Sequence, residues 1–81
     1  MSLELLERAV LTEDVPKEGL CAGDVGVVVE HYPAHDDTPE GYEVEFVTAR
    51  GDTVAVVSVP ATAVRATLES ELLAVRSYAR A

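Results

Sequence analysis

The stretch that decides the fold reads Val25-Gly26-Val27-Val28-Val29-Glu30-His31-Tyr32. Its β-branched valines favour an extended strand. Gly26 interrupts them, and a glycine within a strand often marks a bulge or the close approach of another backbone. Because a bulge at Gly26 would change which side chains share a face, the alternation alone leaves two registers open. We expect Val27 and Val29 to point into the core.

Further strands are predicted on both sides of this stretch. Residues 42–47 alternate cleanly between apolar and acidic side chains, so the apolar ones face the core while Glu43 and Glu45 face solvent. Pro60 ends the strand that follows, because proline cannot donate to a strand ladder. The expected elements are, in order, a strand at 9–12, a long loop at 13–24, strands at 25–32, 42–47 and 53–59, a 3₁₀ turn at 61–63 and a closing strand at 64–68.

Five short strands with turns between them indicate an all-β fold, a small antiparallel barrel. We expect one domain over residues 1–81, with its core at about 9–68 and a C-terminal extension at 69–81. The extension carries apolar residues at helical spacing, which favours a short helix slightly over an added strand.

Four pieces of the chain carry a resemblance: residues 11–16, 23–32, 42–47 and 60–65. Together they are similar to an uncharacterised bacterial domain-of-unknown-function family of small SH3-like barrels, and more distantly to KOW domains. The resemblance implies an SH3-like order of strands, and no established substrate, cofactor or catalytic residue. It also implies a stand-alone protein or the partner of a neighbouring gene product. KOW domains that touch RNA usually place bases near the first hairpin, whereas here no base lies between Lys17 and Arg50.

The charge is strongly negative and unevenly distributed. Six Lys and Arg oppose fifteen Asp and Glu, which gives a net charge of −9. Residues 25–48 contain acids but no Lys or Arg. Nucleic-acid affinity comes mostly from basic side chains that neutralise phosphates, so nucleic-acid binding and attachment to an anionic membrane are both disfavoured. A basic protein would instead be attracted.

The acidic middle of the chain is therefore the candidate site. Its carboxylates serve either to keep a small domain soluble or to bind a basic partner protein. The residues expected to bind the partner are Glu30, Asp36, Asp37, Glu40, Glu43 and Glu45. The resulting hypothesis is a non-catalytic protein-binding module, an antitoxin- or immunity-like protein or an accessory subunit, whose basic partner is the product of an adjacent gene. The alternative is a KOW-like nucleic-acid accessory module, which would use Arg50, Arg65, Arg76 and Arg80.

Enzymatic and metal chemistry are not indicated. The cluster most similar to a metal site consists of His31, His35, Asp36 and Asp37. Structural zinc sites usually need four ligands, often cysteines, so we interpret this cluster as a solvated loop and expect no metal, cofactor or catalysis. The single cysteine, Cys21, excludes an internal disulfide and is expected to be a half-buried small hydrophobe.

Two further expectations concern compartment and assembly. No segment approaches the roughly 20 apolar residues of a membrane helix, and the acidic start does not resemble a signal peptide, so we expect a cytoplasmic protein. Both ends of the chain are unusually apolar. They either pack on each other or form a patch for a second copy, which would give a homodimer, or for a foreign partner. The apolar residues concerned are Leu3, Leu5, Leu6, Leu72, Leu73, Val75 and Tyr78.

Overall fold

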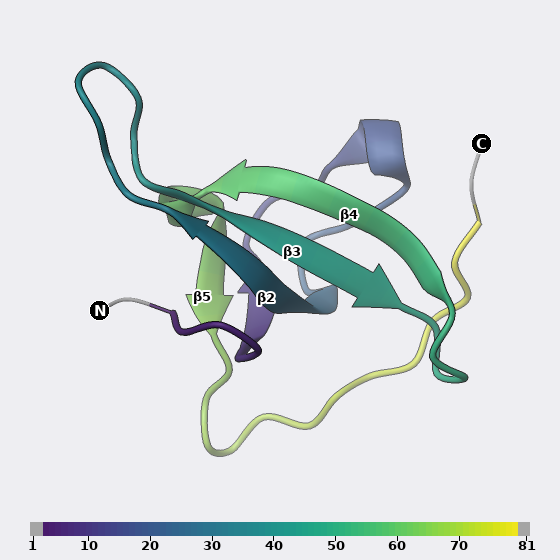
Figure 1. Ribbon diagram of the computed structural model, residues 1–81. Helices are drawn as coiled ribbons and strands as arrows, with labels where there is room; N and C mark the ends of the chain where they lie inside the picture. The colour runs from purple at the N-terminus through teal and green to yellow at the C-terminus, as the bar shows by residue number, and fades with distance from the viewer. Residues whose placement is uncertain (1–2, 80–81) are drawn as a thin grey trace.

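The computed structural model describes residues 3–79, and it consists of one five-stranded antiparallel sheet with the strand order β4-β3-β2-β1-β5 (Figure 1). The elements are β1 (Arg8–Leu11), the 3₁₀ turn η1 (Pro16–Glu18), β2 (Val25–Tyr32), β3 (Gly41–Val47), β4 (Thr53–Pro60), the 3₁₀ turn η2 (Ala61–Ala63) and β5 (Val64–Ala66). The predicted all-β class and the 3₁₀ turn after Pro60 are confirmed. None of the described residues belongs to a helix long and apolar enough to cross a membrane.

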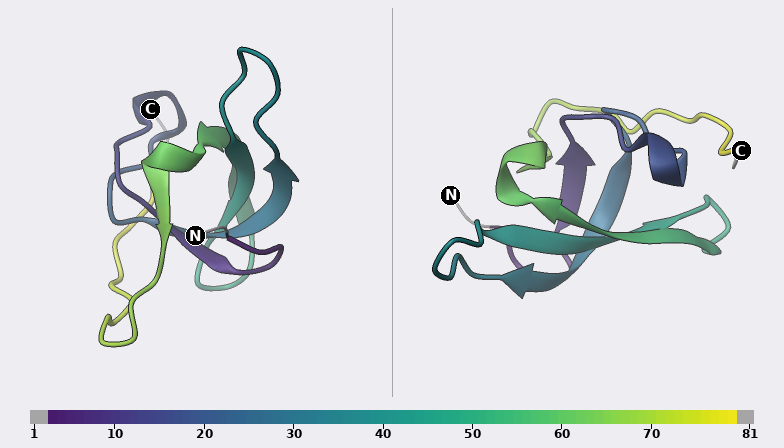
Figure 2. Two further views of the ribbon diagram at one scale, coloured as in Figure 1. Left: turned by 90° about the vertical axis from the view of Figure 1, so that its left-hand side faces the viewer. Right: turned by 90° about the horizontal axis from the view of Figure 1, so that it is seen from above.

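The sheet is strongly curved. Figure 2 shows β1 and β5 standing across the direction of β3 and β4, so that the sheet wraps around a concave inner side. β4 and β5 lie at the two ends of the strand order and are joined directly by η2. The face of β2, β3 and β4 that points away from the inner side is called the outer face below.

The core fills the concave side of this sheet. Leu11, Val28 and Val44 are its largest fully buried side chains. The predicted alternation of β3 is confirmed, because Tyr42, Val44 and Phe46 are buried. Burying side chains of this kind contributes about 1.5–3 kcal/mol each, and strands β1 to β4 all supply them.

The prediction that Val27 and Val29 point inward is wrong. Val28 is fully buried, whereas Val27 and Val29 are half-buried. The β2–β3 register shifts between Val28 and Glu30, so the bulge lies at Val29 and not at Gly26. Gly26 serves the other role of a strand glycine, because a Cβ there would lie 2.6 Å from Val44 Cγ1 and 2.7 Å from the carbonyl oxygen of Glu45.

The expectation of a helix or strand in the C-terminal extension is also wrong. Residues 67–79, called the tail below, form neither, apart from a turn in which the Glu71 amide donates to the Leu68 carbonyl. An isolated helix of this length is marginal unless an apolar face is buried. Here Leu72 and Val75 are 94% and 95% exposed, so no such face exists.

Among residues 3–79, the two ends of the chain do not pack on each other. Figure 1 shows the first and last described residues on opposite sides of the molecule. Leu3 is buried, and its amide donates to the Tyr42 hydroxyl at 3.0 Å. Tyr78, at the other end, packs against the core from the side of the η1 loop.

Candidate functional site

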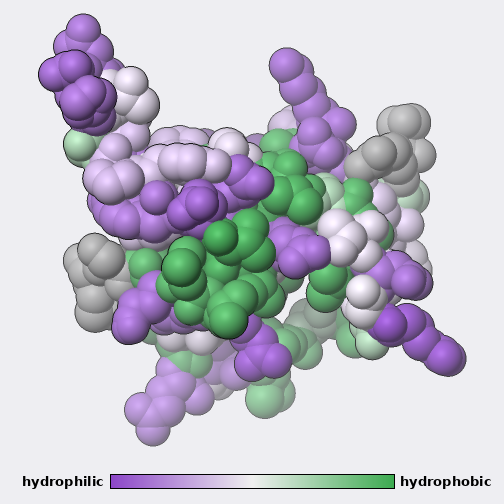
Figure 3. All heavy atoms as spheres, viewed as in Figure 1, coloured by the Kyte–Doolittle hydropathy of each residue, from purple (hydrophilic) through white to green (hydrophobic). Residues whose placement is uncertain are grey.

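Three of the six predicted carboxylates lie together on the outer face. Glu30 on β2 is the register partner of Glu43 on β3, and Glu45 follows two residues later on the same face. Register partners on one face have Cβ atoms about 5 Å apart, so Glu30 and Glu43 are neighbours. We call Glu30, Glu43 and Glu45 the acidic stripe. On this side of the molecule a hydrophilic band lies above an apolar patch that covers β2 (Figure 3).

The bulge at Val29 places Glu30 in the stripe. Strict alternation from the buried Val28 would put Glu30 on the inner side, because side chains two apart share a face. The extra residue reverses the alternation, so Glu30 pairs with the outward Glu43 and His31 pairs with the inward Tyr42. The sequence did contain one signal for this outward orientation. Glu30 is charged, and an unpaired carboxylate is costly to bury.

Hydroxyl groups hold two carboxylates of the stripe. The Tyr32 hydroxyl donates to Glu43 Oε1 at 2.5 Å, and Thr53 Oγ1 donates to Glu45 Oε2 at 2.5 Å. The hydrogen bond to Glu43 raises the pKa of Tyr32, because ionisation would lose this bond and place two negative charges together. Within residues 3–79 no Lys, Arg or His forms an ion pair with the stripe.

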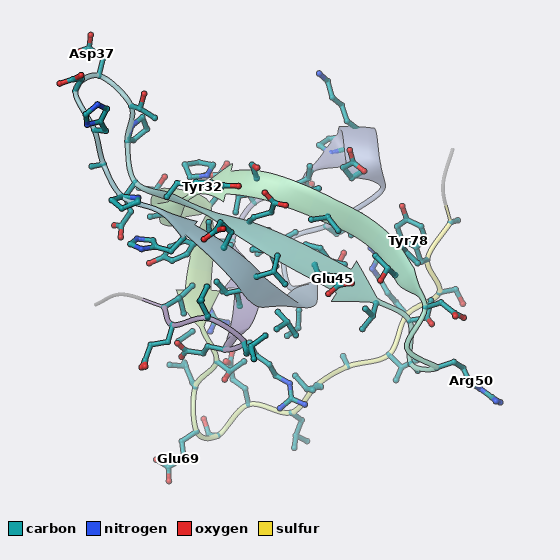
Figure 4. The ribbon with its side chains drawn as sticks, viewed as in Figure 1. Tyr32, Asp37, Glu45, Arg50, Glu69 and Tyr78 are labelled. Carbon is teal, nitrogen blue, oxygen red and sulfur yellow. The ribbon has the colours of Figure 1, made fainter. Side chains whose placement is uncertain are left out.

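The other three predicted carboxylates lie elsewhere. Asp36 and Asp37 occupy the tip of the loop between β2 and β3, and Figure 4 shows Asp37 far from Glu45. This loop closes tightly, because His35 and Thr38 exchange both backbone hydrogen bonds. Glu40 lies on the inner side of the sheet instead. Its Oε2 lies 2.7 Å from His31 Nε2, so the six residues do not share one surface.

The predicted histidine and aspartate cluster is dispersed. The ring of His31 stacks on Tyr42 with centroids 5.0 Å apart, which orients it toward Glu40 rather than toward the loop tip. His35 lies beside Asp36 at 3.3 Å, and both side chains are largely solvated. In the part of the chain that the structure describes, His, Cys, Asp and Glu form no group of three or more suited to a metal ion.

Cys21 is exposed, so the expectation of a half-buried side chain is wrong. Its backbone amide donates to Asp24 Oδ2 at 2.8 Å, and this turn fixes the loop at the surface. The sequence suggested a small hydrophobe from residue type alone. It did not contain the turn geometry that directs the side chain outward.

A second constellation, absent from the sequence predictions, fastens the tail to the loop between β1 and β2. Arg76 Nε donates to Asp24 Oδ1 at 2.8 Å, and Arg76 Nη2 contacts Asp24 Oδ2 and the Gly19 carbonyl. The Tyr78 hydroxyl donates to the Glu18 carbonyl at 2.6 Å. We call these contacts the tail clamp. The hydrogen bond from Arg76 lowers the pKa of Asp24.

The tail borders an open groove of about 580 Å³ beside the sheet. Its lining includes Leu20, Val25, Phe46, Val47 and Val54 from the domain, together with residues 73–78 of the tail. Its charged members, Asp24 and Arg76, are paired with each other in the clamp. The groove therefore presents mainly apolar surface.

The basic residues of the alternative hypothesis are largely engaged. Arg65 binds Glu71 through two hydrogen bonds of 2.9 and 2.6 Å, and the same contacts help lower the pKa of Glu71 to about 2. Arg76 is held by Asp24, and Arg50 is exposed at the tip of the β3–β4 turn (Figure 4). Arg80 lies outside the described residues. Two of the four predicted cations are thus already neutralised.

Comparison with known proteins gives one result. Residues 5–66 match a family described as Domain of unknown function (DUF4926). The match covers all five strands and stops where the tail begins. No curated protein and no solved structure gives a significant match.

Proposed function

Since the chain belongs to the DUF4926 family of domains of unknown function, we propose a function from its surface: a non-catalytic, acidic module that binds a basic partner protein. The binding surface is the outer face of β2, β3 and β4. In finer detail, we propose an SH3-like domain that acts as an antitoxin- or immunity-like protein or as an accessory subunit. Its partner would be the product of an adjacent gene, met in the cytoplasm, where the exposed Cys21 stays reduced.

The acidic stripe is the observation that carries this proposal. Glu30 and Glu43 are like charges placed opposite each other, an arrangement that destabilises a sheet in isolation. A cationic partner would remove that repulsion on binding. The fixed orientation of Glu43 and Glu45 by Tyr32 and Thr53 reduces the ordering cost that a partner must overcome.

Apolar side chains beside the stripe supply the surface that gives affinity. Tyr32 and Val56 are 42% and 48% exposed on the outer face. Interfaces of this type combine a central aromatic or aliphatic contact with charged groups at the rim. The net charge of −9 adds long-range attraction, which raises the association rate more than the affinity.

The test compares two variants of equal net charge as baits in extracts of the native host. Glu30→Gln/Glu43→Gln/Glu45→Gln removes the stripe and changes the net charge from −9 to −6. Glu13→Gln/Asp52→Asn/Glu69→Gln reaches the same −6 at exposed positions away from it. We expect a basic protein that the wild type and the second variant retain at moderate salt and the first does not.

Purified partner titrated against both variants then separates a specific surface from general attraction. Equal loss of affinity in the two variants would show that only net charge matters and would overturn the proposed surface. Size-exclusion chromatography of the wild type tests the remaining alternative, a homodimer through the exposed apolar residues of the chain ends. A dimer disrupted by Leu72→Ser/Val75→Ser would support that alternative instead.

A further inference from the structure

We propose that the partner segment binds as an added strand along the outer edge of β4 at Val56–Ser58, with an apolar residue opposite Val56 and a lysine or arginine opposite Ser58. This inference rests on the proposed function and specifies how the acidic surface is recognised. Three observations support it. Some backbone groups of β4 face away from β3, the strand carries no charged residue, and its outward side chains lie next to those of the acidic stripe.

β4 is the terminal strand of the sheet, so no other strand of the described residues pairs with its outer edge at Val56–Ser58. In Figure 1 it forms the upper border of the sheet. An exposed edge offers a row of backbone donors and acceptors that another extended chain can bind. Edge strands are commonly protected by charges, yet Thr53–Pro60 contains no charged residue.

The register identifies which backbone groups face outward. The Ala61 amide donates to the Glu40 carbonyl at 2.8 Å, and these residues continue the pairing in which Gly41 lies opposite Pro60. Hydrogen-bonded and non-hydrogen-bonded pairs alternate along an antiparallel ladder. Pro60 is therefore in a non-hydrogen-bonded pair, which agrees with its lack of an amide proton.

Counting back along β4 from Pro60 identifies the backbone amides and carbonyls that face away from β3. Val59 and Val57 direct their amides and carbonyls toward β3, whereas Ser58 and Val56 direct theirs to the open edge. A partner strand can thus form hydrogen bonds to both backbone groups of Val56 and of Ser58. A register shift between Phe46 and Val47 disturbs the start of β4, and Pro60 ends the ladder, so the available edge is short.

Side-chain rows on the outer face specify the sequence of the partner. Ser58 lies next to Glu43, which lies next to Glu30. Neighbouring strands are about 4.8 Å apart, so a residue opposite Ser58 stands about 10 Å from β3, within reach of a long cationic side chain. Because serine is small, such a side chain can extend across Ser58 to Glu43.

The neighbouring row has a different character. Val56 is 48% exposed and lies next to Glu45, so an apolar side chain opposite Val56 would cover apolar surface. Since side chains two apart share a face, the partner carries its apolar and basic residues two positions apart. A second copy of this chain fits this edge less well, because its own β4 supplies no cation to meet Glu43.

The test uses two synthetic octapeptides of the sequence Thr-Lys-Thr-Val-Thr-Lys-Thr-Val with blocked ends, in which lysine and valine stand two positions apart and so share one face. One is unmodified, and the other is N-methylated at the amides that would face β4, which removes donors without changing charge. We expect the unmodified peptide to bind at least tenfold more tightly, and to protect the amides of Val56 and Ser58 from hydrogen exchange. Equal binding of the two peptides would overturn strand addition.

Variants of Ser58 give an independent measurement. Ser58→Pro removes an outward amide that the described fold does not use, whereas Ser58→Ala keeps it. We expect peptide affinity to fall at least tenfold in Ser58→Pro and to change less than twofold in Ser58→Ala. If Ser58→Pro does not fold, the comparison of the two peptides on the wild-type protein still decides the matter.

The outcomes separate this inference from the proposed function. Loss of binding in the stripe variant, together with equal binding of the two peptides, retains the acidic surface and overturns strand addition. No binding of either peptide at low salt overturns the inference, while the capture experiment with host extracts still tests the surface. Dimerisation through β4, detected as mutual exchange protection of Val56 and Ser58 without peptide, would also overturn it.

Discussion

Arg76 and Asp24 are joined across 52 positions of the chain, with the guanidinium of the tail on the carboxylate of the loop between β1 and β2. The tail has no regular secondary structure, so its path depends on side-chain contacts of this kind. Tyr78 adds one more contact, to the Glu18 carbonyl at 2.6 Å. Local stability is lowest where backbone hydrogen bonds are few, which makes the tail the first segment to detach.

Replacing Arg76 should therefore release the tail without unfolding the sheet. We expect Arg76→Gln to increase the rate of proteolysis within residues 67–79 several-fold, while the thermal transition of the domain changes little. Arg50→Gln removes the same charge from an exposed turn and serves as the control. Equal protease sensitivity of the wild type and Arg76→Gln would contradict the role of the clamp.

Acid should release the same segment. The pKa of Asp24 is lowered in the folded protein, chiefly by the hydrogen bond from Arg76. A lowered pKa means that the contact contributes fully above the ordinary value of 3.8 and is lost as the pH falls through the lower, folded value. We expect NMR signals of Ser77 and Tyr78 to shift in that acidic range.

Asp24→Asn provides the control for this titration. It should leave those signals independent of pH over the same range, because the titrating group is gone. A transition of unchanged size in Asp24→Asn would assign it to another group. Glu71, whose pKa is also lowered, to about 2, lies at the other end of the tail and would be the first to examine.

The sequence predicted β3 well and β2 less well for one physical reason. In β3 each acidic residue alternates with an apolar one, so the pattern of two fixes which side chains face the core. In β2 three consecutive valines carry no such information. The bulge at Val29 then reverses the alternation, and it is stabilised by long-range pairing with β3 rather than by local sequence.

The candidate site, like the strands, could be predicted only in part from the sequence. Glu43 and Glu45 follow from the alternation of β3, whereas the position of Glu30 depends on the bulge and that of Glu40 on its contact with His31. No sequence pattern predicts the tail clamp. Arg76 and Asp24 are ordinary surface residues in the sequence, and only the folded chain brings them together.

The corrected orientation of β2 can be checked by truncating its valines. Val28 has 0% exposure, so Val28→Ala should lower the free energy of unfolding by about 2–3 kcal/mol through lost burial and the cavity left behind. Val27→Ala, at a half-buried outward position, should cost less than about 1 kcal/mol. Urea denaturation of both variants measures the difference, and the reverse ranking would restore the register expected from sequence.

Gly26 tests the close approach of β2 and β3. A Cβ at this position would meet Val44 Cγ1, the Glu45 carbonyl oxygen and Phe46 Cε1 at 2.6, 2.7 and 2.9 Å. Since the carbonyl cannot move without shifting β3, we expect Gly26→Ala to destabilise the protein by about 3 kcal/mol. Gly51→Ala has open space but positive φ, and should cost only about 1 kcal/mol. Thermal denaturation compares the two.

Glu30 should show a conflict between stability and binding. It lies opposite Glu43 with no cation of the described residues paired to either, so Glu30→Gln should stabilise the free protein by about 0.5 kcal/mol. The same change should weaken binding of a basic partner, because one of the carboxylates that attract the partner's cations is lost. Thermal denaturation measures the first effect and titration of the captured partner the second. A variant that is more stable and binds equally well would show that the repulsion between Glu30 and Glu43 does not serve recognition.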